Sequence, residues 1–216
     1  MKKIPIMLLP CLALLVCSHG GDSDTPTTPS SSSIIFDILT DERDGKTYKW
    51  TMMEANMGAY GQYWMVENLN YEAAGSKCYN DDPANCDKYG RLYDWKTAKT
   101  ACPNGWHIPS DAAWEKFTTF AGGSLVAGKT LKSKTEWGWD KGGGGTDDYG
   151  FSALPGGSHS NGDFSGINES GGWWSSSENG NEARTWIISA ASDYLTRAYY
   201  LKSEYMFSVR CVGLVD

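Results

Sequence analysis

Residues 102–110 read Cys102-Pro103-Asn104-Gly105-Trp106-His107-Ile108-Pro109-Ser110, and residues 208–212 read Ser208-Val209-Arg210-Cys211-Val212. The first stretch places a cysteine beside a turn that leads into a helix, for which Ser110 is a suitable N-cap. The second places a cysteine in an apolar, β-branched run near the C-terminus. A disulfide between them would close the second half of the chain into one loop, as expected of an exported, loop-rich domain.

The N-terminus predicts export. Lys2 and Lys3 precede an apolar stretch over residues 4–16, which is shorter than the ~20 residues that a spanning helix needs. We interpret residues 1–16 as a signal peptide. Cys17 follows directly, as the lipidated cysteine does in a bacterial lipoprotein, although Val16 departs from the Gly, Ala or Ser usual at that position. An ordinary signal peptide cut elsewhere is the alternative, and it also predicts export.

Residues 17–33 are rich in Ser, Thr and Pro, and residues 18–33 carry no apolar side chain, so the segment is expected to be a disordered tether. Residues 34–216 are long enough for a single domain with one good core. Removal of the signal peptide takes away two lysines and lowers the net charge from −7 to −9. This acidic balance argues against nucleic acid as a partner. Membrane contact is expected through the lipid anchor only.

Four cysteines remain after the signal region, namely Cys78, Cys86, Cys102 and Cys211, and they allow three pairings. Cys78 and Cys86 flank a turn-rich loop and are predicted to pair locally. That leaves a long-range pair between Cys102 and Cys211. Zinc binding is the alternative use of these thiolates, but their spacing does not support it.

The hydrophobic pattern predicts an α+β domain with two short helices, small antiparallel sheets and a long ordered loop region. Strands are expected at 34–39, 46–53, 62–69, 173–177, 184–190, 195–202 and 206–212, and helices at 93–101 and 111–121. Residues 125–177 are dense in Gly and Ser yet keep many aromatic residues, which predicts an ordered, mostly non-regular region held by buried rings.

Six segments resemble the Fibrobacter succinogenes major paralogous domain, in collinear order from about residue 37 to 212. They are Asp44-Gly45-Lys46-Thr47-Tyr48, Trp64-Met65-Val66-Glu67-Asn68-Leu69-Asn70-Tyr71, Tyr89-Gly90-Arg91-Leu92-Tyr93-Asp94-Trp95, Ala101-Cys102 with the residues through Ser110, the stretch Gly143 to Gly157, and Phe207-Ser208-Val209-Arg210-Cys211-Val212. The resemblance implies an exported protein of a family without an established biochemical activity. It also implies a C-type-lectin-like fold, in which a long loop region builds the binding site.

Enzymatic activity is not expected. The formylglycine-generating oxidases, which share the implied fold, use a cysteine pair late in the domain, and residues 176–182 contain none. His107 is interpreted as a packing residue and His159 as a solvent-exposed one, and no Ser/His/Asp arrangement follows from the spacing.

Two candidate sites remain. Asp147 and Asp148 could offer oxygen ligands to Ca²⁺, although adjacent aspartates also form ordinary loop turns, and no other cofactor is expected. Trp173 and Trp174 point to opposite faces if they lie on a strand, so one ring is expected at the surface beside Glu178 and Asn179. Such a group would suit a sugar. The alternative is that both rings are buried.

These observations favour a surface-anchored lipoprotein that carries a non-catalytic binding or adhesion module for a cell-surface glycan or protein. The expected location is the outer membrane or cell surface, or the medium if the anchor is absent. A structural surface component without a small ligand is the second hypothesis. An enzyme on the formylglycine-generating type of fold is the third.

Overall fold

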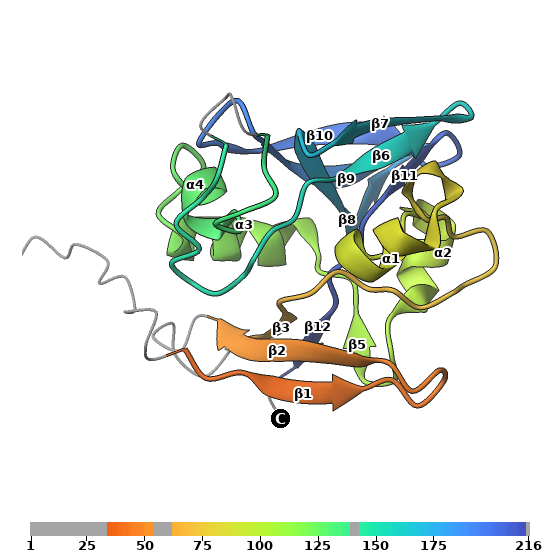
Figure 1. Ribbon diagram of the computed structural model, residues 1–216, viewed down its shortest axis with the longest axis horizontal. Helices are drawn as coiled ribbons and strands as arrows, with labels where there is room; N and C mark the ends of the chain where they lie inside the picture. Colours follow the sequence, from red (N-terminus) through yellow and green to blue (C-terminus); the bar gives the residue numbers. More distant parts are fainter. Residues whose placement is uncertain (1–33, 54–61, 139–142, 215–216) are drawn as a thin grey trace, which may run out of the picture.

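The computed structural model describes residues 34–53, 62–138 and 143–214. The predicted signal peptide (1–16), the tether (17–33) and the lipidation site Cys17 therefore lie outside the described residues. The described part is mostly β-structure with a few short helices (Figure 1). None of its helices is long and apolar enough to cross a membrane.

The strands that the structure describes are β1 (Asp37–Thr40), β2 (Thr47–Met53), β3 (Gln62–Met65), β4 (Tyr93–Asp94), β5 (Trp106–His107), β6 (Gly156–Ser160), β7 (Asp163–Ile167), β8 (Ser170–Asn179), β9 (Glu182–Ser189), β10 (Leu195–Leu201), β11 (Tyr205–Phe207) and β12 (Val212–Leu214). The helices are η2 (Tyr79–Asp81, a 3₁₀ turn), α1 (Pro83–Tyr89), α2 (Trp95–Ala101), α3 (Asp111–Phe120) and α4 (Ala127–Leu131).

The strands form two sheets, seen at the bottom and the top of Figure 1, with the helices packed between and beside them. The lower sheet has the order β1-β2-β3-β12-β5, and all of its neighbours are antiparallel. Val212 on β12 pairs with both Trp64 and His107, so the last strand of the domain is held between two early ones. The two ends of the described domain are thereby joined in one sheet.

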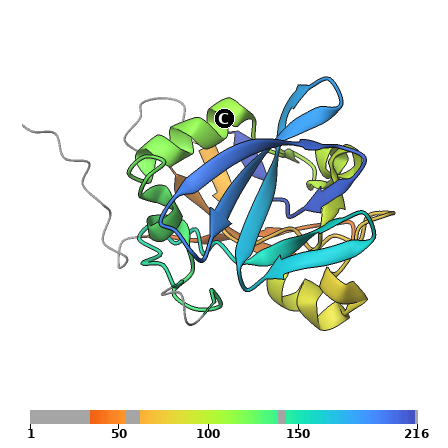
Figure 2. The same cartoon turned by 90° about the horizontal axis from the view of Figure 1, so that it is seen from above.

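The upper sheet has the order β10-β9-β8-β6-β11-β4, and β7 pairs with β6. Seen from above, its long strands β8, β9 and β10 curl across the molecule (Figure 2). Only β6 and β8 run parallel among its named pairs, through Gly157 and Gly171. Strand β8 has a neighbour on each edge, and its residues Trp173 and Trp174 are buried in two different hydrophobic cores.

Short-range signals explain several elements. Ser110 caps α3, because its hydroxyl accepts a hydrogen bond from the Ala113 amide at 3.1 Å. Gly45 closes the β1–β2 hairpin at a φ of +75°, a conformation that glycine adopts without strain. Asp94 caps α2 in the same way as Ser110 caps α3. The predicted strands at 34–39 and 46–53 and the predicted helices at 93–101 and 111–121 are confirmed within a few residues.

Two aromatic-rich cores lie on opposite faces of β8. In the first, Trp64, Trp114 and Phe117 are fully buried, and the Trp64 and Phe117 rings stack at 4.6 Å. The second core contains Tyr93, Trp95 and Phe207 together with Cys211. Aromatic rings bury a large apolar area each, so these two clusters supply much of the hydrophobic stabilisation.

One expectation about local structure is wrong: the described residues contain four α-helices and not two, since α1 and α4 were not predicted. The region 125–177 contains α4, β6, β7 and most of β8, and more than half of its described residues lie outside these elements. Its rings Trp137, Tyr149 and Phe151 are buried, as expected. Its glycines lie largely within hairpins and close backbone contacts: a side chain on Gly172, for example, would collide with the Phe207 ring at 2.5 Å.

The run 206–212 is likewise not one strand. The chain leaves the upper sheet after Phe207, which pairs with Tyr93, and enters the lower sheet at Val212. Phe207, Val209 and Cys211 still lie in one core. The residues between the two strands carry the connection from one sheet to the other.

Both predicted disulfides are confirmed. Cys78 bonds to Cys86 across 8 residues, and Cys102 bonds to Cys211 across 109 residues. The second bridge joins the end of α2 to residues 208–211, the sheet-crossing segment that connects β11 to β12, and Cys211 is fully buried.

Candidate functional site

A groove of about 790 Å³ opens between the lower sheet, α1 and the long loop. Its walls come from five segments that lie far apart in the sequence. The residues that line it are Phe36, Gly45, Lys46, Thr47, Tyr48, Lys49, Val66, Glu67, Asn68, Asn70, Cys86, Asp87, Lys88, Tyr89, Gly90, Asp147, Gly150, Ser152 and Leu154.

Asn68 forms the floor of the groove and is 5% exposed. Its amide nitrogen donates to the Tyr89 carbonyl at 2.8 Å, at the end of α1. Its Oδ1 accepts from the Trp173 indole at 2.9 Å and from the Arg210 Nε at 2.7 Å. One side chain therefore connects the lower-sheet segment, α1, the central strand β8 and the sheet-crossing segment.

Arg210 is fully buried beneath this floor. Besides Asn68, its guanidinium donates to the carbonyl oxygens of Phe151 at 2.5 Å, Ser152 at 3.0 Å and Met65 at 3.4 Å. No carboxylate of a described residue lies within ion-pair distance of it. Burial lowers the pKa of Arg210 to about 9, with Glu67 and Asp147 as more distant charges that oppose the shift.

The hydrogen-bonded guanidinium of Arg210 holds the loop that contains residues 147–154 against the rest of the domain. A buried charge is costly unless hydrogen bonds compensate it, and here neutral oxygens accept four hydrogen bonds from the guanidinium. Phe151 and Ser152 contribute two of these oxygens from the loop wall of the groove. The position of that wall therefore depends on Arg210.

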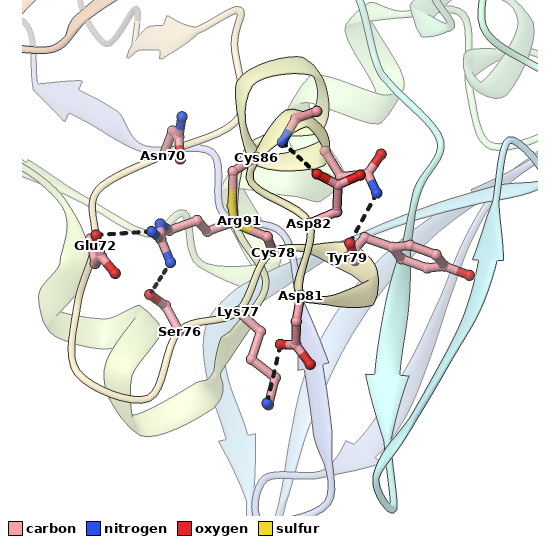
Figure 3. The surroundings of a disulfide bond; sticks show 12 residues. Asn70, Glu72, Ser76, Lys77, Cys78, Tyr79, Asp81, Asp82, Cys86 and Arg91 are labelled. Atoms are coloured by element: carbon pink, nitrogen blue, oxygen red, sulfur yellow. Dashed lines mark hydrogen bonds and ion pairs between the residues drawn. A yellow bond between two sulfur atoms is a disulfide. The ribbon is translucent and has the colours of Figure 1, made fainter.

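Helix α1 forms the opposite wall, and the Cys78–Cys86 bridge fixes its middle residue, Cys86, to the segment before the helix (Figure 3). Asp82 caps the helix by accepting from the Ala84 amide at 3.0 Å. Close to the bridge, Arg91 pairs with Glu72 at 3.1 Å and donates to Ser76 at 3.3 Å. These contacts hold α1 and the preceding loop in place, and Cys86 of the bridge also lines the groove.

The end of α1 fits closely against the floor. Gly90 has a φ of +75°, and a Cβ at this position would lie 2.6 Å from the Asn68 Cβ. Only glycine combines this backbone conformation with so close an approach. The Tyr89-Gly90 motif thus has a local physical cause.

Strand β2 and the segment after β3 form the third wall. The Lys46 ammonium donates to the Asn70 carbonyl at 2.6 Å, and the Asn70 amide donates to the Tyr48 hydroxyl at 3.1 Å. Glu67 accepts from the Lys49 backbone amide at 2.7 Å, where β3 no longer pairs with β2. Burial raises the pKa of Tyr48 to about 12, so this hydroxyl stays protonated at physiological pH.

The loop wall is shaped by Asp147. Its carboxylate accepts from both the amide and the hydroxyl of Ser152 at 2.7 Å, and its own φ is +50°. The Phe36 ring covers Gly150, where an added Cβ would lie 2.6 Å from the Phe36 Cζ. Asp147 therefore stabilises the loop, as the turn interpretation of the aspartate pair allows.

Three side chains on the walls do not hydrogen-bond or pair with other described groups of the domain. Phe36 is 43% exposed. The Lys49 ammonium and the Asp87 carboxylate, on β2 and α1, form no ion pair or hydrogen bond with any residue in the described ranges. By contrast, Lys46 pairs with Asp44 and Lys88 with Glu136. The groove thus offers one exposed ring and one unpaired charge of each sign.

The expectation that one of Trp173 and Trp174 lies at the surface is wrong, since both rings have an exposure of 0%. They do point to opposite faces of β8, as predicted. Trp173 packs on the α3 side, 6.2 Å from the Trp114 ring, and Trp174 packs 5.0 Å from the Phe207 ring. Because helices and the second sheet cover both faces, neither ring is available for a sugar.

The other predicted site residues are not brought together with the tryptophans. Glu178 and Asn179 are exposed at the end of β8, and Glu178 pairs with Lys202. Asp147 lines the groove, whereas Asp148 does not. Within the described ranges, no cluster of three or more His, Cys, Asp or Glu side chains could hold a metal ion. Calcium binding at Asp147 and Asp148 stays a prediction.

Sequence reasoning missed the groove and the role of Arg210. One signal was present: Arg210 is a charged residue between Val209 and Cys211 in an otherwise apolar run. A charged side chain in such a run either points to the solvent-exposed face of a strand or is buried with hydrogen-bond acceptors around it. The partners come from residues 65, 68, 151 and 152, and no local pattern links these positions.

Several of the segments that carry the family resemblance contribute to this site. The stretch from Val66 to Asn70 supplies the floor, Tyr89-Gly90 the helix end, residues 147–154 the loop wall, and Arg210 the connection beneath. The chain matches no curated protein and no solved structure. Residues 57–213 match the family model described as the Fibrobacter succinogenes major domain. Because this match covers most of the chain, the protein belongs to the Fibrobacter succinogenes major domain family.

Proposed function

We propose that this chain is an exported, surface-anchored lipoprotein whose folded part is a non-catalytic binding or adhesion module for a glycan or a partner protein. One observation carries the proposal: the groove has walls that are fixed by a disulfide, helix caps and a buried arginine, while Phe36, Lys49 and Asp87 remain unused on them. Preorganised walls with free contact groups are what a recognition site requires.

The chemistry of the groove supports binding over catalysis. Its lining includes no histidine and no free thiol, since Cys86 is disulfide-bonded. His107 is on β5 of the lower sheet and His159 is on β6 of the upper sheet. Nucleophilic catalysis would need a nucleophile and a base within hydrogen-bond reach of each other. An unrecognised enzyme and a purely structural component are the alternatives.

We also infer the C-type-lectin-like arrangement that the resemblance implies. Three features support it: the last strand pairs with an early one in the lower sheet, a disulfide ties the second half together, and a long loop lines the groove. Since fold alone does not determine function, the proposal rests on the groove and not on this likeness.

The proposal is tested by binding of the full chain to a glycan array and to cell-surface proteins. A double variant, Lys49→Ala with Asp87→Ala, serves as the groove variant. We expect wild-type binding that this variant loses while its melting temperature stays within a few degrees. If no glycan and no protein binds, the structural-component alternative is favoured.

The anchor is tested separately through Cys17→Ala in a chain that keeps a cleavable signal. We expect this variant to be released in soluble form, because a lipid chain on Cys17 would be the membrane contact. If the variant remains bound to membranes, the lipoprotein assignment is wrong, although the groove proposal is unaffected.

A further inference from the structure

The groove itself indicates the class of its ligand. It has a volume of about 790 Å³ and is partly open to solvent, so it has room for a few sugar units. Its walls lie on three different parts of the fold, with β2 facing α1 across the floor at Asn68. Because the groove is not enclosed, it can hold an internal segment of a linear polymer, whose two ends would continue into solvent.

The charges on the walls argue against a ligand that carries one sign of charge. Lys49 and Asp87 are both unpaired within the described chain, and both line the groove. The lining holds three lysines and three carboxylates, so a ligand of either charge meets both attraction and repulsion: Lys46, Lys49 and Lys88 against Glu67, Asp87 and Asp147. A hydroxyl group satisfies both, because it accepts a hydrogen bond from the ammonium and donates one to the carboxylate.

The exposed ring completes this chemistry. Phe36 is held over Gly150 and keeps 43% of its surface free. The apolar face of a sugar ring can stack on such a side chain at little conformational cost, because phenylalanine has few rotatable bonds. One ring, one donor and one acceptor around an open groove match the surface of a pyranose.

We propose that the groove binds an internal segment of a neutral oligosaccharide, with one sugar ring stacked on Phe36 and sugar hydroxyls bonded to Lys49 and Asp87. This inference rests on the proposed function and specifies its ligand. A protein partner that presents a peptide segment to the same groove is the competing occupant.

The test is calorimetric titration of the full chain with soluble hexasaccharides. The neutral probes are β-1,4-glucan, α-1,4-glucan, β-1,4-mannan and β-1,4-xylan, and the charged probes are galacturonan and chitosan. We expect at least one neutral probe to bind and both charged probes to bind more weakly. Phe36→Ala should weaken that binding by about tenfold or more, and Asp87→Asn by a few-fold.

Tyr199→Ala is the matched control, because Tyr199 is a similarly exposed ring (39%) on β10, which does not line the groove. It should leave the affinity unchanged within twofold. Failure of every neutral probe to bind, or equal losses in Phe36→Ala and Tyr199→Ala, would overturn the inference. If a protein partner binds and the groove variants abolish its binding, the proposed function stands and the glycan assignment is wrong.

Discussion

Replacing Arg210 with Met should destabilise the domain severely. Methionine fills a similar volume but donates no hydrogen bond, so the carbonyl oxygens of Phe151 and Ser152 would be buried without donors. Each such loss costs about 1–3 kcal/mol. Removal of a desolvated charge offsets part of this cost, and the net loss of unfolding free energy should be about 2–5 kcal/mol.

The assay is urea denaturation of the wild type and two variants. Arg197→Met is the control, since Arg197 is 38% exposed and pairs with Asp111 and Glu115 at the surface. It should cost no more than about 1 kcal/mol. For a domain of this size, the melting temperature of Arg210→Met should fall by roughly 5–20 °C. A loss below about 1 kcal/mol in Arg210→Met would refute the idea that this arginine holds the loop wall in place.

Three further predictions concern stability. Cys211→Ser should cost about 2 kcal/mol more unfolding free energy than Cys78→Ser, because the lost bridges span 109 and 8 residues, and equal losses in urea denaturation would contradict this. Gly90→Ala should lower the melting temperature well below that of Gly105→Ala, since both have positive φ but only Gly90 lacks room for a Cβ, and equal shifts would show that the close contact with Asn68 is unimportant. Hydrogen bonding to Arg43 lowers the pKa of Asp41, so the stability that this carboxylate contributes is present above its ordinary pKa and is lost as the pH falls through the folded value. The Asp41→Asn variant should therefore lose less unfolding free energy than the wild type between pH 6 and pH 3. Parallel pH profiles of the two proteins would contradict this.

The features of the fold that depend on residues close together in the sequence could be predicted. The cap at Ser110, the hairpin at Gly45 and the local bridge between Cys78 and Cys86 could all be predicted because each depends on a few consecutive positions. The long bridge to Cys211 followed once the local pair was assigned. Helix α1 was missed because its sequence between Cys78 and Cys86 is typical of a turn-rich loop, and α4 was missed because five residues are too few to show a helical period.

The tryptophan pair shows where sequence reasoning ends. Alternation on a strand correctly placed Trp173 and Trp174 on opposite faces. Whether a face is covered depends on the rest of the fold, and here α3 lies on one side and the Phe207 cluster on the other. The groove was missed for the same reason, since Phe36, Lys49 and Asp87 are neighbours only after folding.

The most direct test of the account is a map of amide chemical shifts in the ¹⁵N-labelled full chain during titration with the neutral hexasaccharides. We predict that shifts concentrate around Phe36, residues 45–49, 66–70, 86–90 and 147–154, which together line the groove. Shifts concentrated instead at Glu178 and Asn179, or the absence of shifts with every probe, would contradict the claim that this groove is the glycan-binding site.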